Sequence, residues 1–197
     1  MNYSGIEKVF SRKYILASKS PRRISLLKQI GINFSVVDSE ADEFESNYHR
    51  PLTIIKHNSK LKAYAVKRKY SDRIIIAADT IVYINKMVLH KPSDKKEAFK
   101  YLRLLSGNEH TVYTGIYIIN CFSGTEIFDY EKTKVCFRKL SSREIKYYIE
   151  NFNPVDKAGA YGIQEDFGCL FIKKITGDFY NVVGLPLTKL YLNLLKI

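Results

Sequence analysis

The 197-residue chain contains no tryptophan, five prolines and three cysteines. The cysteines, Cys121, Cys136 and Cys169, are scattered and form no C-x-x-C pair, which argues against a zinc or dithiol site. Their odd number suits a reducing cytoplasm, where we expect the protein to work. No apolar stretch approaches the roughly 20 residues that a membrane helix needs, so we expect no membrane partner.

Signatures of several enzyme classes are missing as well. There is no G-x-S-x-G elbow and no H-E-x-x-H helix. The histidines lack metal-ligand spacing, and we interpret each as a surface or core residue: His49, His57, His90 and His110. The chain also lacks repeats and low-complexity tracts, and its length fits one domain over residues 1–197.

Acidic residues are scarce relative to basic ones, 20 against 32, and the formal net charge is +12. An excess of this kind can indicate nucleic acid or an anionic substrate as a partner. The lysines, however, are spread along the chain without a basic tail or an arginine-rich block. We therefore interpret most of the charge as solvated surface and give a nucleic-acid partner little weight.

The most informative segment covers residues 14–31. Its apolar start, residues 14–17, predicts a buried strand. Ser20 suits an N-cap, Pro21 suits the first helical position, and Gly31 suits the position after the helix ends. The segment therefore predicts a strand, a short polar turn and a helix of about three turns.

Two arginines conflict with the polarity of this predicted helix. Arg22 and Arg23 fall in its first turn, where the macrodipole is positive and cations cost free energy. Free backbone N–H groups and the hydroxyls of Ser18 and Ser20 converge on the same turn. A bound phosphate would offset the cost, and the alternative is a solvated basic turn.

Residues 53–70 predict a helix that carries a lysine on its apolar side. At about 100° per residue, the apolar arc consists of Ile54, Ile55, Leu61, Ala65 and Val66. Lys62 falls inside this arc, and a lysine on an apolar face needs a partner. A satisfied structural lysine is the default interpretation, and phosphate contact is the functional one.

An aspartate follows the most apolar strand of the chain. Residues 74–78 predict a strand buried on both faces, and Asp79 interrupts an apolar run that resumes at Ile81. A carboxylate in this position is costly unless it meets a metal, a base or a proton to abstract. We favour a functional aspartate over a structural one at a strand end.

A second group of carboxylates lies in residues 38–45, an acidic segment in a basic chain. Glu43 or its neighbours could hold a hard divalent cation, because carboxylate oxygens are its preferred ligands. The alternative is a solvated loop without a ligand.

The other patterns complete a mixed α/β prediction. Capping boxes at Asp94–Glu97 and Ser141–Glu144 predict two helices, and Pro186 suits the start of a last one. The glycine-rich segment 154–165 predicts irregular backbone that can approach a ligand closely. Strands are predicted at residues 33–37, 87–89, 110–120, 125–138 and 168–174.

Several of these segments resemble, in order, the motifs of the Maf family of nucleoside triphosphate pyrophosphatases. The similar segments are residues 16–27 (LASKSPRRISLL), 77–80 (AADT), 91–92 (KP), 157–164 (KAGAYGIQ) and 177–187 (GDFYNVVGLPL). The resemblance implies a mixed α/β fold like that of inosine triphosphatase, with an elongated sheet flanked by helices. It also implies two lobes with a central cleft, and a homodimer is a further expectation because family members are often dimeric.

The resemblance implies roles for individual residues. Asp79 matches the proton acceptor, and Glu43 with Asp79 matches the acidic positions near the metal. The phosphate-contacting positions are matched by Ser18, Arg23, Lys62 and Lys91. The positions that separate subfamilies by substrate are matched by Arg22, Thr80 and Gln164. This trio looks like that of the dTTP/UTP pyrophosphatases.

The activity that the resemblance implies is hydrolysis of a nucleoside triphosphate between its α and β phosphates. The products would be the monophosphate and pyrophosphate, and the cofactor a divalent cation: Mg²⁺, Mn²⁺ or Co²⁺. The expected substrates are dTTP, UTP or a modified pyrimidine nucleotide. Two alternatives stay open, a 7-methyl-GTP pyrophosphatase and a non-catalytic regulator of cell division that binds nucleotides or nucleic acid.

Overall fold

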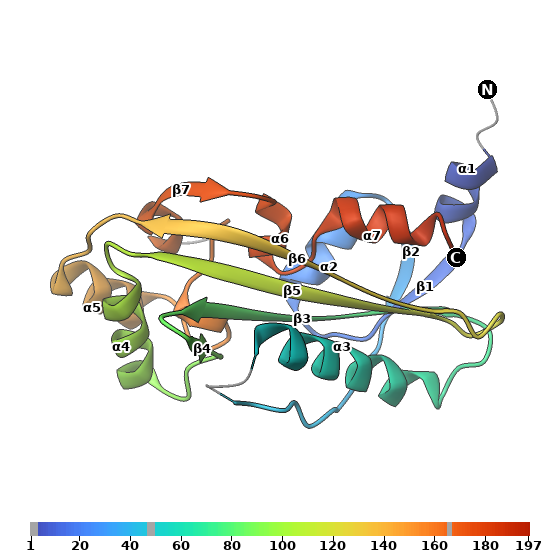
Figure 1. Ribbon diagram of the computed structural model, residues 1–197, viewed down its shortest axis with the longest axis horizontal. Coiled ribbons are helices and arrows are strands. Elements are labelled where there is room, and N and C mark those ends of the chain that lie inside the picture. Colours follow the sequence, from blue (N-terminus) through green and yellow to red (C-terminus); the bar gives the residue numbers. More distant parts are fainter. Residues whose placement is uncertain (1–3, 47–49, 165–166) are drawn as a thin grey trace.

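The structure, a computed structural model, describes residues 4–46, 50–164 and 167–197 (Figure 1). His49 and Glu165, which belong to the patterns discussed above, lie outside these ranges. A seven-stranded sheet runs along the molecule in the order β2-β1-β3-β5-β6-β7, with β4 beside β3. Its strands are β1 (Lys13–Leu16), β2 (Asn33–Val36), β3 (Ile74–Ile84), β4 (Met87–Leu89), β5 (Glu109–Asn120), β6 (Glu126–Phe137) and β7 (Ile172–Thr176).

The sheet has a parallel part and an antiparallel part. β1 is parallel to β2 and β3, and the connections between them contain α2 (Pro21–Gln29) and α3 (Pro51–Lys67). From β3 onward, the pairs β3–β5, β5–β6 and β6–β7 are antiparallel. Leu16 pairs with Ile76, and the Ala17 amide donates to the Ile76 carbonyl at 2.8 Å. The polar turn after β1 therefore lies beside residues 77–80 of β3.

Helices cover both faces of the sheet and lie at both of its ends (Figure 1). α3 packs on one face, and α2 lies on the other with α6 (Phe179–Val183) and α7 (Leu187–Leu194). α4 (Lys95–Leu105) and α5 (Ser142–Asn151) lie at the end near β4, and α1 (Ser4–Ser11) lies at the opposite end. This arrangement confirms the expected mixed α/β fold with an elongated sheet flanked by helices.

Successive residues of β3 face opposite helix layers, which explains its uninterrupted apolar start. Ile74 and Ile76 pack in the core formed with α2 and α7, whereas Ile75 and Ala77 pack with α3. A further apolar cluster joins α4 and α5 to β3, β5 and β6 at the far end of the sheet. The prediction of a strand buried on both faces is therefore confirmed.

The predicted helix starts are also confirmed where side-chain caps were expected. The side chains of Ser20 and Asp94 accept hydrogen bonds from the amides three residues ahead, and Ser141 with Glu144 forms a complete capping box. Gly31 follows the C-cap of α2 with a φ of 75°, a backbone conformation that glycine adopts without strain.

One boundary prediction was wrong in a way that matters for function. Asp79 does not follow the end of a strand, because β3 continues through it to Ile84. Its backbone stays in the ladder and pairs with Gly115 of β5. A Cβ at Gly115 would lie 3.0 Å from the Ile55 carbonyl oxygen, so this glycine lets α3 approach the sheet opposite Asp79. Asp79 is therefore fixed in the middle of the sheet.

Two other predictions need correction. Residues 168–174 are not one strand: a 3₁₀ helix, Phe167–Phe171, precedes β7, and packing of Phe171 in the core fixes this turn. In α3, Leu61 and Ala65 are only half-buried. The buried side of α3 is rotated toward polar residues that face a cavity, including Asn58 and Lys62. The helices α1 and α6 were not predicted.

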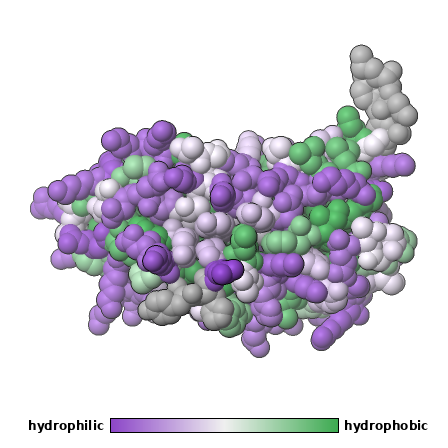
Figure 2. Space-filling model, in the orientation of Figure 1, coloured by the Kyte–Doolittle hydropathy of each residue, from purple (hydrophilic) through white to green (hydrophobic). Residues whose placement is uncertain are grey.

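Polar residues cover much of the face shown in Figure 2, and hydrophobic ones gather toward the end that carries α1 and α7. There Ile6, Phe10 and Leu195 are exposed. Within the described ranges, no helix combines the length and apolar character needed to cross a bilayer.

Candidate active site

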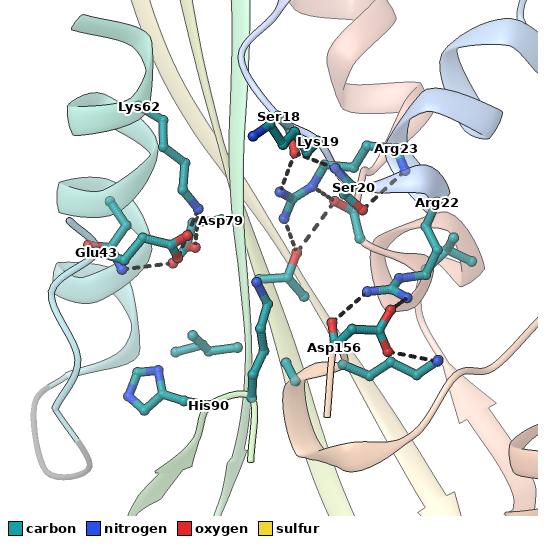
Figure 3. A pocket seen from close by; sticks show the side chains of 18 of the residues that line it. Ser18, Lys19, Ser20, Arg22, Arg23, Glu43, Lys62, Asp79, His90 and Asp156 are labelled. Carbon is teal, nitrogen blue, oxygen red and sulfur yellow. Dashed lines mark hydrogen bonds and ion pairs between the residues drawn. The ribbon is translucent and has the colours of Figure 1, made fainter. Parts of the chain in front are cut away.

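A cavity of about 560 Å³ opens between α2, α3 and residues 154–164 of the glycine-rich segment. This volume is typical of small-molecule sites. Its lining includes every residue that the sequence singled out for a role in binding or chemistry: Ser18, Arg22, Arg23, Glu43, Lys62, Asp79, Thr80, Lys91 and Gln164. Figure 3 shows how the charged side chains among them divide between two sides of the cavity.

One side, here called the carboxylate wall, consists of Glu43, Lys62 and Asp79 (Figure 3). Lys62 Nζ lies 2.8 Å from Asp79 Oδ1 and 3.0 Å from Glu43 Oε2. Asp79 is 4% exposed and Lys62 is 6% exposed, so water screens their ion pair poorly. Lys62 is therefore a paired lysine, as its default interpretation required, and it also faces the cavity.

The ionisation of Asp79 follows from these contacts. Burial alone would raise the pKa of its carboxyl, but Lys62 and Arg23 offset this, and the pKa lies below its ordinary value. Asp79 is therefore a carboxylate at neutral pH and can accept a proton or bind a cation.

The opposite side, here called the arginine wall, contains Ser18 and Arg23 (Figure 3). Thr80, which contacts the Arg23 guanidinium, completes it. The Arg23 guanidinium donates to Gly184 O at 2.9 Å, Thr80 Oγ1 at 3.0 Å and Ser18 Oγ at 3.2 Å. All three acceptors are neutral, and within the described ranges no carboxylate is in ion-pair contact with this guanidinium. Burial lowers the pKa of Arg23, but a guanidinium keeps its proton in proteins.

The arginine wall therefore presents, at the amino end of α2, a cation whose direct hydrogen-bond acceptors are all neutral. Because helix amides and the macrodipole also favour negative charge there, the wall is suited to a phosphate. Ser18 Oγ additionally accepts from the Ser20 amide at 3.2 Å, which holds the turn in shape.

Arg22, by contrast, has a carboxylate partner from a distant part of the chain. Its guanidinium donates to Asp156 Oδ2 at 3.1 Å and to Asp156 O at 2.9 Å. Asp156 also pairs with Lys157, whose ammonium lies 2.9 Å from Asp156 Oδ1. No local sequence pattern pointed to Asp156, because its partner is 134 residues away. The bridge joins α2 to the start of the glycine-rich segment.

The remaining predicted residues differ in how firmly they are held. The Thr80 hydroxyl lies 3.0 Å from Thr114 Oγ1 in addition to its bond with Arg23. Lys91 and Gln164 are exposed residues of the cavity lining, one just after β4 and one near the end of the glycine-rich segment. Thr80 is thus part of the fixed frame, whereas Lys91 and Gln164 are accessible to a ligand.

Besides Asp156, two further polar residues of this cavity were missed by the sequence interpretation. Asn58 is 2% exposed and donates to Asp79 Oδ2 at 3.3 Å. Its spacing of four residues from Lys62 places both on one side of α3, a signal that was present. Tyr161 lies 2.7 Å through its hydroxyl from Nε2 of His110, a buried residue of β5. No local sequence pattern predicts that contact.

Of the carboxylates that line the cavity, Glu43 and Asp79 are the two that meet at Lys62, and a divalent cation could use both. No group of three or more His, Cys, Asp or Glu side chains in the described ranges could hold a metal ion. Mg²⁺ commonly takes one or two carboxylates, several waters and the phosphates of a substrate. The donor set therefore fits a cation shared with a substrate and does not fit an all-protein cage.

The fold and cavity define a mixed α/β protein whose cleft opposes an anionic and a cationic wall. Residues 13–197 match the family described as Maf-like protein, and the chain belongs to this family. It is 51% identical over 176 residues to a dTTP/UTP pyrophosphatase of Cytophaga hutchinsonii, covering 89% of this chain and 80% of the relative. It is 47% identical over 180 residues to a dTTP/UTP pyrophosphatase of Thermoanaerobacter sp. (strain X514), covering 91% and 93%.

Solved structures offer a more distant comparison. A HAM1 protein from Coxiella burnetii overlaps with a TM-score of 0.48 at 12% identity, over 64% of this chain and 73% of that one.

Proposed function

We propose that this protein hydrolyses nucleoside triphosphates to the monophosphate and pyrophosphate, with dTTP and UTP as preferred substrates. The observation that carries the proposal is one cavity with Arg23 on one side and the carboxylates of Asp79 and Glu43 on the other. Arg23 suits the binding of phosphates. The carboxylates suit the general base and the cation that such a reaction needs. The names of the two relatives support the substrate class.

The phosphates would bind along the arginine wall. The Arg23 guanidinium has five N–H donors, and three are directed at Gly184, Thr80 and Ser18, so others stay available for phosphate oxygens. Lys62 and Lys91 add positive charge from the other sides of the cavity. Because Arg23 is already held in place, its charge needs no reorganisation when negative charge develops on the triphosphate.

Asp79 would act as the general base. Its carboxylate is ionised, buried and directed into the cavity, and Lys62 and Asn58 fix its orientation. It would orient a water molecule and take up its proton as the water oxygen attacks the α phosphorus in line. The bond to the bridging oxygen breaks and pyrophosphate leaves. Lys62, which contacts Asp79, would stabilise the negative charge on the departing phosphates.

Glu43 and Asp79 would hold a divalent cation, with Mg²⁺, Mn²⁺ and Co²⁺ as the candidates. When bound, the cation neutralises charge on the phosphates.

Base recognition would depend on Arg22, Thr80 and Gln164. A glutamine amide has donors and an acceptor, which match the N3–H and carbonyl groups of a uracil-type ring. Thymine and uracil share this edge and differ by a methyl group, which a pocket distinguishes weakly. Thr80 would contribute through the position of Arg23, because its hydroxyl is already bonded to that side chain. A modified pyrimidine with the same edge also fits.

The test is a screen for pyrophosphate release with dTTP, UTP, CTP, GTP, 7-methyl-GTP and base-modified pyrimidine nucleotides, in the presence of Mg²⁺, Mn²⁺ or Co²⁺. We expect kcat/KM to be highest for dTTP, UTP or a modified uracil nucleotide, and activity to disappear with EDTA. A best rate with GTP or 7-methyl-GTP would contradict the proposed base preference. No pyrophosphate from any nucleotide, with steeply salt-dependent nucleic-acid binding, would favour the regulatory alternative.

We further propose that the protein works in the cytoplasm and forms a homodimer. The sequence has an odd number of cysteines, scattered along the chain, which fits a reducing compartment. Cell fractionation tests the first point and analytical ultracentrifugation the second.

A further inference from the structure

Asn58 makes three hydrogen bonds in a buried part of the cavity wall. Its Oδ1 accepts from the Phe44 amide at 2.9 Å, and its Nδ2 donates to the Phe44 carbonyl at 3.1 Å. Nδ2 also donates to Asp79 Oδ2 at 3.3 Å. The side chain is 2% exposed, so water cannot readily replace these partners.

The chemistry of the partners determines the orientation of this amide. Two of them, the Phe44 carbonyl and the Asp79 carboxylate, can only accept hydrogen bonds, and the third, the Phe44 amide, can only donate. Turning the amide over would place oxygen against two oxygens and nitrogen against N–H. Both donors and the acceptor of Asn58 are therefore used in one arrangement.

The segment that Asn58 holds has no regular structure of its own. Residues 37–46 form neither helix nor strand, yet Glu43 in this segment reaches Lys62 Nζ at 3.0 Å. Asn58 pairs with both backbone groups of the residue directly after Glu43. The contacts close a ring from Asp79 through Lys62, Glu43 and Phe44 to Asn58 and back to Asp79.

We propose that Asn58 is the positioning residue that anchors the acidic segment over the cavity and holds Glu43 and Asp79 in register as a cation-binding pair. A side chain without the amide would remove both hydrogen bonds to the Phe44 backbone and the hydrogen bond to Asp79 Oδ2. The link to turnover rests on the function proposed above, whereas the anchoring does not.

The experiment uses Asn58→Ala in the full-length protein, with Asn58→Ser as a second variant in case the first does not fold. The matched control is Asn193→Ala. Asn193 is also a 2% exposed asparagine that donates to a carboxylate, Asp129 Oδ2 at 2.8 Å, but it lies outside the cavity lining. Circular dichroism verifies that each variant is folded.

Three quantities are measured. Hydrogen exchange of residues 41–46 should become faster in the Asn58 variants, because the Phe44 amide loses its acceptor. Mn²⁺ affinity, titrated directly on the protein without nucleotide, and turnover with dTTP should each fall by about 10–100-fold, as expected for loss of a group that orients metal ligands. Asn193→Ala should change none of the three by a comparable amount.

Unchanged exchange of residues 41–46 in a folded Asn58 variant would overturn the anchoring. Faster exchange with unchanged Mn²⁺ affinity would overturn the coupling to the cation pair. If the wild-type protein releases no pyrophosphate, the proposed function fails, while exchange and Mn²⁺ binding still decide the role of Asn58.

Discussion

The two sides of the cavity carry opposite and differently compensated charge. On the carboxylate wall, Lys62 is shared by two carboxylates, which leaves one net negative charge. On the arginine wall, Arg23 is held only by neutral oxygens and keeps its full positive charge. A triphosphate with a divalent cation has the same polarity, negative phosphate oxygens beside a positive ion. The difference between the walls therefore explains how one small cavity can orient such a ligand.

The walls also differ in how they are built. The arginine wall is formed by a turn and a helix start that lie close together in sequence, completed by residues of β3 and Gly184. The carboxylate wall requires β3, α3 and an irregular segment to meet. We therefore expect substitutions on the arginine wall to act mainly on phosphate binding, and substitutions on the carboxylate wall to act on the chemical step and on the cation.

The largest effect is expected from Asp79→Asn, which removes the proposed base and keeps the shape of the side chain. Turnover with dTTP should fall by about 10²–10⁴-fold, as for loss of a general base. Nucleotide binding, measured by equilibrium dialysis, should largely persist because the arginine wall is intact. Turnover close to that of the wild type would show that the base lies elsewhere.

Arg23→Ala tests the opposite wall. Losing this fixed donor should cost about 10²–10³-fold in kcat if the contact strengthens in the transition state. If Arg23 binds the substrate and the transition state equally well, its loss should raise KM and leave kcat unchanged. Steady-state kinetics separate the two, with Arg73→Ala, a partly exposed arginine outside the cavity lining, as the control. Identical kcat and KM in a folded Arg23 variant would contradict the division into two walls.

Gln164→Ala should have a smaller effect that is limited to selectivity. The ratio of kcat/KM for UTP to that for GTP should fall by a factor corresponding to about 1–3 kcal/mol. The measurement applies the same substrate panel to the wild type and to Gln164→Ala. Both proteins should still turn over nucleotides, because Asp79 is intact in each. An unchanged ranking and unchanged rates would exclude Gln164 from base recognition.

A stability experiment tests whether His110 of β5, whose Nε2 lies 2.7 Å from the Tyr161 hydroxyl, is buried in its neutral form. Burial lowers the pKa of His110 to about 3, against 6.5 for the free side chain. The unfolded state therefore binds a proton below about pH 6.5 that the folded state does not, and stability falls as pH decreases from there toward 3. Relative to pH 7, we expect a loss of about 2 kcal/mol at pH 4.5 from this group.

The check is urea unfolding of the wild type and of His110→Gln at both pH values. Because other carboxyl groups titrate in both proteins, the informative quantity is the difference between them. His110→Gln should lack the additional acid sensitivity, and equal pH dependence in the two proteins would mean that His110 is not buried in its neutral form.

Much of the architecture was predictable because its signals are local. Caps at Ser20, Asp94 and Ser141 mark helix starts by bonds within three residues, and the apolar start of β3 marks a strand buried on both faces. Segment 168–174 was misassigned because no local signal in it distinguishes a strand from a 3₁₀ turn. A short apolar run fits a strand and a buried 3₁₀ turn equally well, and packing of Phe171 selects the turn.

Two candidate site residues were found where charge interrupts an apolar pattern. Asp79 in the strand and Lys62 on the helix stood out because burying either charge without a partner is costly. Asn58 and Asp156 did not stand out, because a neutral amide or a loop carboxylate violates no local rule. Their importance depends on Phe44 and Arg22, which only the folded chain brings near them.

The sequence by itself therefore determined most helices and strands and the arginine turn, since each follows from neighbours a few positions away. Local patterns singled out Asp79 and Lys62, whereas Lys91 and Gln164 became candidates only through the resemblance to the Maf family. The ion pairing of Lys62 with both carboxylates, the Arg22–Asp156 bridge and the opposition of the two walls depended on strand order and register. Those are set by the sum of many long-range packing contacts, and no local pattern in the chain encodes which distant side chains they bring into contact.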